Sequence, residues 1–322
     1  MSSNLIIFGA GASFGSQKSN IPPIGNSLYD ALATFNPPGW GSLPQNLVAI
    51  LKQDFEKGME ELYNNHNHVL TQSQCVMAEY FFNFIPTPSS LYVELAKRIQ
   101  SNDWDGVLAT LNYERLLENS FRSVGLEVVP QPTKYPQIEV CYPHGCCNFF
   151  CEGISGQRIT LSKNKLVFNG PGSILRFDKP GSSVNFTPDG ITTGSQSIKR
   201  INDPNLFSQK INNSFPPVMS YFIPSKFTTS CANFIKSQRI RFQKLISEAD
   251  KIAIIGLKIR PHDQHVWDPI SKSSAKVIYC SGSSGKDYKQ WAKSNRSNTK
   301  NDLVLSAHWE QSFDRICSEL GL

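Results

Sequence analysis

The sequence predicts an α/β fold, a doubly wound (Rossmann-like) parallel sheet with a helical insertion and a smaller loop-rich module. One observation is the segment "NLIIF" at 4–8, which reads as a buried strand running into the glycine turn "GAG" at 9–11. A second is that strand and helix patterns alternate at both ends of the 322-residue chain. This alternation is typical of a parallel sheet covered by helices, and two stretches of unlike composition interrupt it.

We expect five segments: Rossmann-like parts at 1–42, 104–145 and 234–322, a helical insertion at 43–103, and a small module at 146–233. Helix-like patterns at 47–63, 73–84 and 89–100 predict the insertion. The small module is rich in Gly, Ser, Asn and Pro, with short β-like pieces such as "KLVFNG" and "SILRF".

The remaining strands of the sheet are expected in five apolar segments, "GVLATL", "IEVC" (stopped by Pro143), "KIAII", "KVIYC" and "DLVLS". Helices are expected from Ser27 to Phe35, at 114–124 and at 229–249, and in "KDYKQWAKS" and "HWEQSFDRICSEL". Each helix follows or precedes a strand, as in βαβ units.

Composition describes an ordinary globular protein, with 39% hydrophobic and 18% charged residues. No apolar run is long enough to span a membrane and no secretory leader is visible, so we expect a cytoplasmic protein without a membrane partner. The net charge of +6 is scattered, which favours a solvated surface over direct nucleic-acid binding. The basic segment 236–244 is expected to be a helix with Ile240 facing inward.

The turn after the first strand lacks large side chains. Gly9 and Gly11 would let a diphosphate approach the backbone, and a following helix would offer free N–H groups. Ala12 and Ser13 continue the bare stretch, and the serine hydroxyl suits either a helix cap or a phosphate. The alternative is a tight strand-to-helix turn that binds no ligand.

The match to the dehydrogenase fingerprint Gly-x-Gly-x-x-Gly is partial. Gly9 and Gly11 fit, whereas Phe14 occupies the third glycine position and Gly15 follows one residue late. Asp30 stands near where a ribose-binding acid is expected, but two prolines displace its helix.

Four expected strands end in small or polar residues, at the edge where a nucleotide would bind. These are Asn112 with Tyr113, His144 with Gly145, Gly256, and Ser281 with Gly282. Each has a structural alternative, since an asparagine often caps the following helix and a histidine before glycine often stabilises a turn.

Cysteines and histidines are the candidate metal ligands. Cys141, Cys146, Cys147 and Cys151 lie close together in sequence but form no Cys-x-x-Cys unit, so we favour reduced thiols over structural zinc and expect no metal. His262, Asp263 and His265 are metal-ligand types or a helix-start cluster, and His66 and His68 are expected to be solvated.

The motif order Gly-Ala-Gly-Ala-Ser, Asn-Tyr-Glu, His-Gly and a late "IIG" strand resembles the sirtuin family. The resemblance covers about residues 1–35, 104–150 and 245–322, and is closer to the sirtuin-like domains of bacterial antiphage systems, through "ATLNYER" and "IPSKF", than to protein deacylases. Glu114 replaces the family's usual aspartate. The paired zinc-binding cysteines and the Gly-x-Pro-x-Phe-Arg element of deacylases are missing.

The resemblance implies that NAD is the substrate and that its nicotinamide–ribose bond is cleaved. It implies that Asn112 orients water and the ribose hydroxyls and that His144 acts as a base. The residues expected to bind NAD are Gly9, Ala10, Gly11, Ala12, Ser13, Tyr113, Gly256, Ser281 and Gly282.

The expected activity is therefore an NAD hydrolase that depletes NAD in antiphage defence. A protein deacylase and a non-catalytic NAD or ADP-ribose sensor are the alternatives. Because such an activity must be restrained, we expect a homo-oligomer or an activating partner, for which a helicase-like ATPase is a family precedent.

Overall fold

The chain divides by its internal contacts into two units. The structure is a computed structural model that describes residues 3–25, 27–161, 165–195, 197–212, 215–223, 225–260 and 263–322. The first of the two units, which we call the sheet unit, comprises Met1–Pro22, Phe84–Pro143 and Gln238–Leu322. The second, the mixed unit, comprises Pro23–Asn83 and His144–Ser237.

The sheet unit is built on seven parallel strands in the order β15-β14-β13-β1-β2-β4-β3. In chain order they are β1 (Asn4–Phe8), β2 (Val107–Thr110), β3 (Glu127–Val129), β4 (Gln137–Cys141), β13 (Lys251–Ile255), β14 (Lys276–Cys280) and β15 (Leu303–Leu305). The first half of the chain extends the sheet from β1 through β2, and the last third extends it from β13 in the opposite direction. This arrangement confirms the predicted doubly wound parallel sheet; β3 is a short strand that the sequence pattern did not indicate.

The helices of this unit are α1 (Ala10–Phe14), α6 (Leu91–Ser101), α7 (Leu116–Ser123), α10 (Gln264–Lys272), η3 (Gly282–Ser284), α11 (Gly285–Asn295) and α12 (Trp309–Leu320). Helix α9 (Ala232–Glu248) begins in the mixed unit and ends in the sheet unit. Helix α6, which the sequence placed in the helical insertion, belongs to the sheet unit by its contacts.

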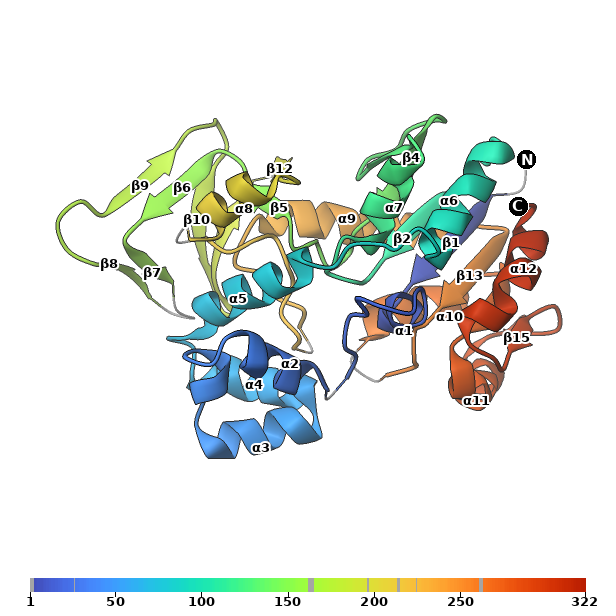
Figure 1. Cartoon of the computed structure of the whole chain (residues 1–322), viewed down its shortest axis with the longest axis horizontal. Coiled ribbons are helices and arrows are strands. Elements are labelled where there is room, and N and C mark those ends of the chain that lie inside the picture. The colour runs from blue at the N-terminus through green and yellow to red at the C-terminus, as the bar shows by residue number, and fades with distance from the viewer. Residues whose placement is uncertain are drawn as a thin grey trace. The chain divides into compact units, whose positions relative to one another are not determined.

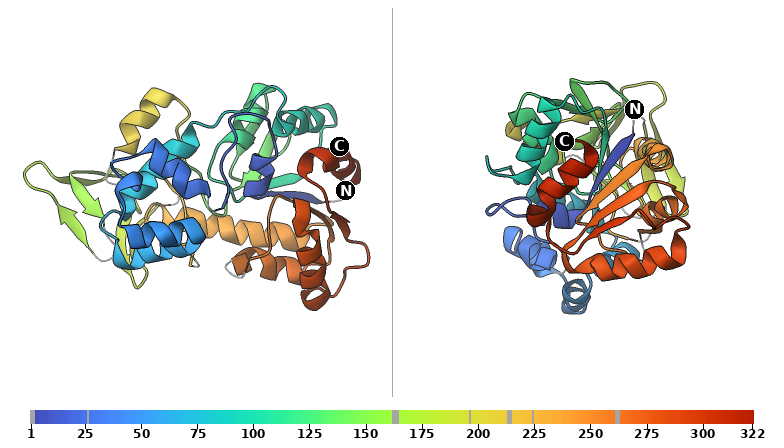
Figure 2. Two further views of the ribbon diagram at one scale, coloured as in Figure 1. Left: turned by 60° about the horizontal axis from the view of Figure 1, so that its bottom comes forward. Right: turned by 90° about the vertical axis from the view of Figure 1, so that its right-hand side faces the viewer.

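Strand β1 lies at the centre of the sheet, and all five of its residues are buried. Leu5 and Ile7 pack into a hydrophobic core with side chains of α9, α10 and α11. Phe8 faces the opposite side, where its ring lies 5.2 Å from that of Tyr92 and 5.7 Å from that of Trp309. Alternation along a strand sends neighbouring side chains to opposite faces, so helices cover both faces of the sheet. In Figure 2, α12 in red and α9 in orange lie on opposite sides of the strands.

Helix α9 buries Phe242, Leu245 and Ile246 in this core, at helical spacing. Ile240 is 59% exposed, so the prediction that it faces inward is wrong. It lies two residues before Phe242, which places it away from the face that packs on the sheet.

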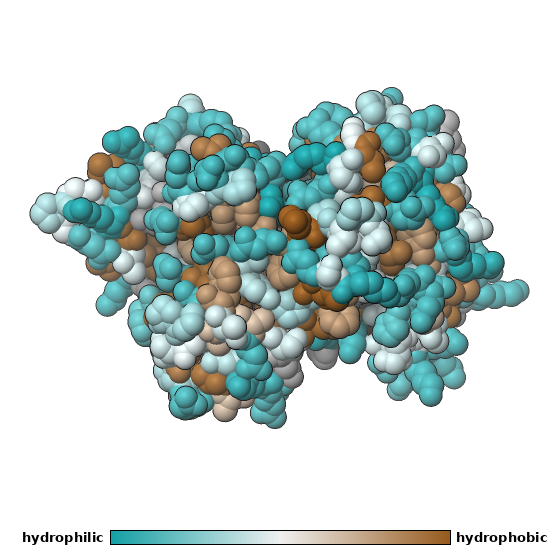
Figure 3. Space-filling model, viewed as in Figure 1, coloured by the Kyte–Doolittle hydropathy of each residue, from teal (hydrophilic) through white to brown (hydrophobic). Residues whose placement is uncertain are grey.

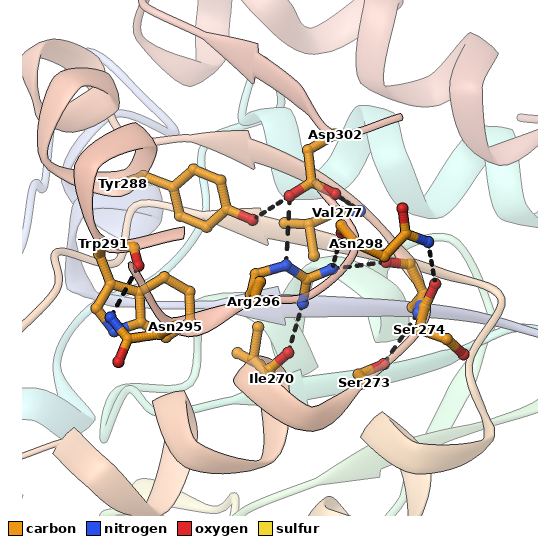
Figure 4. Close-up of polar contacts among 11 residues, drawn as sticks. Ile270, Ser273, Ser274, Val277, Tyr288, Trp291, Asn295, Arg296, Asn298 and Asp302 are labelled. Atoms are coloured by element: carbon orange, nitrogen blue, oxygen red, sulfur yellow. Dashed lines mark hydrogen bonds and ion pairs between the residues drawn. The ribbon is translucent and has the colours of Figure 1, made fainter. Parts of the chain in front are cut away.

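A polar network lies at the amino ends of the sheet strands (Figure 4). It consists of Arg296, Asp302, Tyr288 and the backbone groups that they contact, and we call it the amino-edge network. The buried guanidinium of Arg296, after α11, donates to the carbonyl groups of Ile270 and of Ala275 (2.9 Å) and lies 3.3 Å from the carboxylate of Asp302. Asp302 also accepts from the Tyr288 hydroxyl at 2.8 Å and from a backbone N–H at the start of β14. Buried charges are tolerated when they are paired and hydrogen-bonded in this way.

The start of β1 and the end of α12 lie side by side at this side of the sheet unit (Figure 1). The side chain of Asn4 donates to the carbonyl of Leu320 at 3.1 Å, and the indole N–H of Trp104 donates to the same carbonyl at 3.3 Å.

The mixed unit combines helices with short antiparallel strand pairs (Figure 1). Its helices are α2 (Ser27–Phe35), η1 (Trp40–Ser42), α3 (Gln45–Gln53), α4 (Phe55–Asn65), α5 (Leu70–Phe82) and α8 (Pro204–Ile211). Its strands are β5 (Phe149–Cys151), β6 (Ile154–Gln157), β7 (Ile159–Leu161), β8 (Leu166–Phe168), β9 (Ile174–Phe177), β10 (Ser183–Thr187), β11 (Gly190–Gly194) and β12 (Ile198–Arg200). They pair as β5–β12, β6–β9, β7–β8 and β10–β11.

One helix-like pattern is broken in the structure. The segment 47–63, read as one helix, forms α3 and α4, because Asp54 adopts an extended conformation (φ −151°) between them. Its carboxylate accepts from the N–H groups of Glu56 and Lys57 and so caps α4.

The surface in Figure 3 is largely hydrophilic, with hydrophobic residues in small spots. Along the described part of the chain, no helix combines the length and the apolar character that a membrane span requires.

Candidate functional site

The carboxyl ends of β1 and β13 mark the place where the strand order reverses. In open α/β sheets, ligands bind in the crevice outside the carboxyl ends of the strands at such a switch point. Gly9 follows β1, Gly256 follows β13, and Asn112 stands two residues after β2, the other neighbour of β1. Three of the predicted site positions therefore lie at this edge of one sheet.

The glycine turn packs directly on the turn after β13. The N–H of Gly9 donates to the carbonyl of Ile255, and that of Gly11 to the carbonyl of Gly256, both at 2.9 Å. A Cβ on Gly9 or Gly11 would lie 2.7 or 2.9 Å from the Gly256 oxygen. Gly256 has φ +68°, and a Cβ there would lie 1.9 Å from the nitrogen of Ala12.

This backbone-to-backbone packing accounts for the three glycines without a ligand. The N–H groups of Gly9 and Gly11 are hydrogen-bonded to backbone carbonyls, so these two groups are not available as donors to a phosphate. Phosphate binding at this turn therefore stays a prediction. Of its other members, Ala10 is exposed and Ala12 is fully buried.

Asn112 ties β2 to the glycine turn. Its side-chain nitrogen donates to the carbonyl of Gly9 at 3.1 Å and to the hydroxyl of Ser13 at 2.8 Å. Both amide hydrogens are thereby used, and the side chain is 6% exposed. The alternative that Asn112 caps the following helix is wrong, because Glu114 accepts from the N–H of Leu116, the first residue of α7, at 2.6 Å.

Asn112 is part of a buried cluster with Ser13, Tyr92 and Glu114, which we call the carboxyl-edge network. The Ser13 hydroxyl lies 2.5 Å from a Glu114 carboxylate oxygen and 3.0 Å from the Tyr92 hydroxyl. None of the four residues is more than 7% exposed. The elements β1, α1, α6 and β2 thus meet through one set of hydrogen bonds.

Burial governs the electrostatics of this network. It raises the pKa of Glu114 above the ordinary carboxyl value, although hydrogen bonds from Ser13 and the Leu116 N–H act in the opposite direction. Burial and the nearby Glu114 carboxylate raise the pKa of Tyr92 well above its ordinary value, so this phenol stays protonated. The protonated phenol can therefore donate to the Ser13 hydroxyl, which in turn donates to the Glu114 carboxylate.

Tyr92 is the member of this network that the sequence did not indicate. It lies 79 residues from Ser13 in the chain, on a helix whose pattern shows only an amphipathic face. No local signal distinguishes such a tyrosine from the core residues beside it.

His144 is the first residue of the mixed unit, three residues after β4. Its carbonyl accepts from the N–H of Ser220 at 2.8 Å, and the residue is 5% exposed. Gly145 has φ +80°, and a Cβ there would lie 1.8 Å from the carbonyl oxygen of Val218, so only glycine fits. Asn112 belongs to the sheet unit, and the convergence of the two side chains stays a prediction.

The remaining predicted positions lie in the sheet unit. Tyr113 is buried, and Ser281 and Gly282 follow β14, the neighbour of β13. The N–H of Gly282, which has φ +55°, donates to the carbonyl of Ala307 at 3.1 Å. Their role in binding NAD stays a prediction.

The cysteine cluster is divided between the units. Cys141 ends β4 in the sheet unit, whereas Cys146, Cys147 and Cys151 lie in the mixed unit. Within the described ranges, no group of three or more His, Cys, Asp or Glu residues could hold a metal ion, and the cysteines are free thiols. His262 lies outside the described residues.

Several solved structures of Sir2 homologues align with nearly the whole chain. A mutant Sir2 homologue in complex with ADP-ribose gives a TM-score of 0.44 and 13% identity, covering 99% of this chain and 92% of that chain. A Sir2 homologue in complex with NAD gives 0.42 and 14%, with 99% and 90% covered. Sir2 bound to an acetylated peptide gives 0.44 and 12%, with 99% and 93% covered.

No protein-family profile and no curated relative matches the chain. At TM-scores below 0.5 and identities below 15%, the Sir2 structures do not assign the chain to a family.

Proposed function

We propose that the chain is an NAD hydrolase that cleaves the nicotinamide–ribose bond and releases nicotinamide and ADP-ribose. The observation that carries the proposal is the position of Asn112, whose carboxamide is anchored at the carboxyl edge of the sheet beside the switch point. The order of the Gly-Ala-Gly-Ala-Ser, Asn-Tyr-Glu and His-Gly motifs along the sequence supports the same activity.

The chemistry of the bond suits a site of this kind. Nicotinamide is cationic within NAD and leaves as a neutral base, so the reaction needs no acid to protonate it. The ribose passes through an oxocarbenium-like state, as in other glycoside cleavage. A fixed amide dipole can stabilise that charge and orient a water molecule. Because both amide hydrogens of Asn112 are bonded to the protein, its oxygen performs this role.

His144 is the proposed base, acting on the water or on a ribose hydroxyl. A histidine has an ordinary pKa of about 6.5, close to neutral pH, and general-base assistance is typically worth about 10²–10⁴ in rate. The proposed NAD-binding residues are Gly9, Ala10, Gly11, Ala12, Ser13, Tyr113, Gly256, Ser281 and Gly282. NAD is the substrate in this proposal, and no metal takes part.

The test is product analysis with the purified full chain. NAD is incubated with and without an acyl-lysine peptide, and the products are separated by chromatography. We expect nicotinamide and ADP-ribose in equal amounts without peptide. Release of O-acetyl-ADP-ribose only with peptide would instead identify a deacylase. If the chain alone is silent, the assay is repeated with the protein encoded beside it. Binding of NAD without turnover under both conditions would identify a sensor, and either a deacylase or a sensor result rejects the proposal.

The role of His144 is tested by His144→Gln, which keeps a polar side chain but removes the base. We expect the rate of NAD cleavage to fall by about 10²–10⁴. His68→Gln, in the same unit and 6.5 Å from the ring of His66, is the matched control and should keep the wild-type rate. Equal rates for both variants would remove His144 from the mechanism.

The proposed biological setting rests on the resemblance of the sequence motifs, and the proposed control rests on the toxicity of NAD depletion. We propose that the protein is cytoplasmic, acts in antiphage defence, and is controlled through homo-oligomers or an activating partner such as a helicase-like ATPase. Size measurement of the purified protein, alone and with its substrate, tests the oligomer.

A further inference from the structure

Two cysteines that are distant in sequence meet in the mixed unit. Cys151 is the last residue of β5, and Cys231 immediately precedes α9. Thr193 of β11 bonds to both: its hydroxyl donates to the Cys151 sulfur at 3.5 Å and accepts from the Cys231 N–H at 2.8 Å. One threonine side chain therefore holds the Cys151 sulfur and the Cys231 backbone close together.

Their surroundings differ in a way that assigns each a role. Cys231 is fully buried, and its sulfur lies 2.8 Å from the carbonyl oxygen of Ser195 and 3.6 Å from that of Ser197. Carbonyl oxygens beside a sulfur disfavour a thiolate. Cys151 is only partly buried, so small reagents can reach it.

The pKa values agree with this geometry. The hydrogen bond with Cys231 lowers the pKa of Cys151 to about 7, although burial acts in the opposite direction. The same contact, together with burial, raises the pKa of Cys231. A thiol with a pKa of about 7 is about half thiolate at neutral pH, and the thiolate is the reactive form.

The backbone holds Cys231 in an unusual conformation. Its φ is +54°, in the left-handed region of the backbone that residues other than Gly, Asn and Asp rarely adopt. The bond from its N–H to Thr193 fixes this turn at the start of α9. The fold therefore holds a cysteine, rather than the usual glycine or asparagine, at the threonine that also bonds Cys151.

We propose that Cys151 and Cys231 form a redox site that a peroxide converts reversibly to a disulfide. The Cys151 thiolate attacks one peroxide oxygen and breaks the O–O bond, which gives a sulfenic acid and releases hydroxide. The Cys231 sulfur then attacks the Cys151 sulfur, and its proton leaves with the displaced hydroxyl as water. The two thiols lose two electrons, the peroxide gains them, and a thiol reductant restores the pair.

The other cysteines provide internal comparisons. Burial raises the pKa of Cys75 to about 12 and also raises that of Cys141 and Cys280. Cys280 donates to the carbonyl of Ala307 at 3.4 Å, much as Cys231 does to Ser195, but no cysteine in the described part of the chain interacts with it. Cys280→Ser is therefore the matched control.

The experiment treats the reduced full chain with hydrogen peroxide at low molar excess and counts free thiols after denaturation. We expect the eight thiols of the sequence to decrease by two, and peptide mass spectrometry to identify a link between Cys151 and Cys231. Dithiothreitol should restore both thiols. The Cys280→Ser variant should lose two thiols in the same way, whereas Cys151→Ser should lose none.

The order of attack is tested with dimedone, which traps sulfenic acids. In Cys231→Ser, whose hydroxyl can still donate to Ser195, Cys151 should be labelled about ten-fold more than in the wild type, because no thiol resolves it. Peptide mapping of the wild-type protein requires no variant, so a folding defect cannot hide the result. Unchanged thiols, a disulfide between other cysteines, or overoxidation of Cys151 without a link to Cys231 would overturn the proposal, whatever the outcome of the NAD assay.

Discussion

Two buried polar networks lie at opposite edges of the same sheet, and they are built differently. The amino-edge network pairs a guanidinium with a carboxylate, Arg296 with Asp302, and Tyr288 supports the pair. In the carboxyl-edge network, the Glu114 carboxylate accepts from the Ser13 hydroxyl and from the N–H of Leu116, and Asn112 donates to the same Ser13 hydroxyl.

The difference indicates different roles. Arg296 and Asp302 hydrogen-bond to backbone groups of α10 and β14, and they follow α11 and precede β15. The ion pair therefore has a structural role, which is to hold these four elements together. The carboxyl edge keeps a buried carboxylate whose pKa is raised, which costs folding free energy. Proteins tolerate such costs at functional sites. The predictions below test this contrast, beginning with the largest effect.

Asn112→Ala should lower the rate of NAD cleavage by about 10²–10⁴, because the oxygen that orients the reaction is removed. The rate is measured per folded molecule, since the variant also loses two hydrogen bonds. Asn4→Ala is the control: Asn4 is likewise buried and hydrogen-bonded, but it lies at the other end of β1. If both variants keep the wild-type rate, the carboxyl edge is structural like the amino edge.

Arg296→Met should lower the free energy of unfolding by about 3–5 kcal/mol, because it leaves Asp302 as a buried charge without its guanidinium. The rate of NAD cleavage per folded molecule should stay unchanged. Urea denaturation measures the loss. Lys18→Met, which removes an exposed ion pair with Glu310, should change stability little; a loss as large as that of Arg296→Met would contradict the assignment.

A matched pair of tyrosine variants compares the networks directly. Tyr288→Phe removes a hydrogen bond to a carboxylate and should cost about 1.5–3 kcal/mol, whereas Tyr92→Phe removes one to a serine hydroxyl and should cost about 0.5–1.5 kcal/mol. Thermal and urea unfolding of both variants test the order. The reverse order would mean that the Tyr92 hydroxyl bonds chiefly to the Glu114 carboxylate.

The pH dependence of stability gives the smallest effect. Because the pKa of Glu114 is raised in the folded protein, folding favours its protonated form, and wild-type stability falls as the pH rises from the ordinary carboxyl pKa of 4.5 through the raised value. Glu114→Gln lacks this loss. The difference in unfolding free energy should change by at most about 1.4 kcal/mol per pH unit in this window. If the unfolding free energies of the two proteins changed with pH in parallel, burial would not perturb the pKa of Glu114.

Apart from β3, the strands of the seven-stranded sheet were predictable because each is a short apolar run that ends near a glycine, a proline or a polar residue. The sequence of β1 and its glycine turn also indicated that another group touches the backbone there. That group is the turn at Gly256, which is 245 residues further along the chain than Gly11. Periodicity describes local structure and therefore carries no information about such partners.

The predictions that were wrong or incomplete have the same origin, because they too rest on the periodicity of the local sequence. An inward Ile240 is compatible with the helical pattern, but the sheet packs against the face that carries Phe242 and Leu245. A continuous helix through Asp54 is compatible with the apolar spacing, but its side chain stabilises a helix start more than a helix interior. The role of Tyr92 depends on a contact that only the fold creates.

The central position of β1 has a consequence for biosynthesis. Asn4 pairs with Lys251, so β1 finds one of its two neighbours only after 247 further residues have been made. Such non-local pairing slows folding and prolongs the exposure of apolar segments to aggregation. Nascent chains that end before β13 should accordingly require chaperones, and their release should coincide with synthesis of that strand.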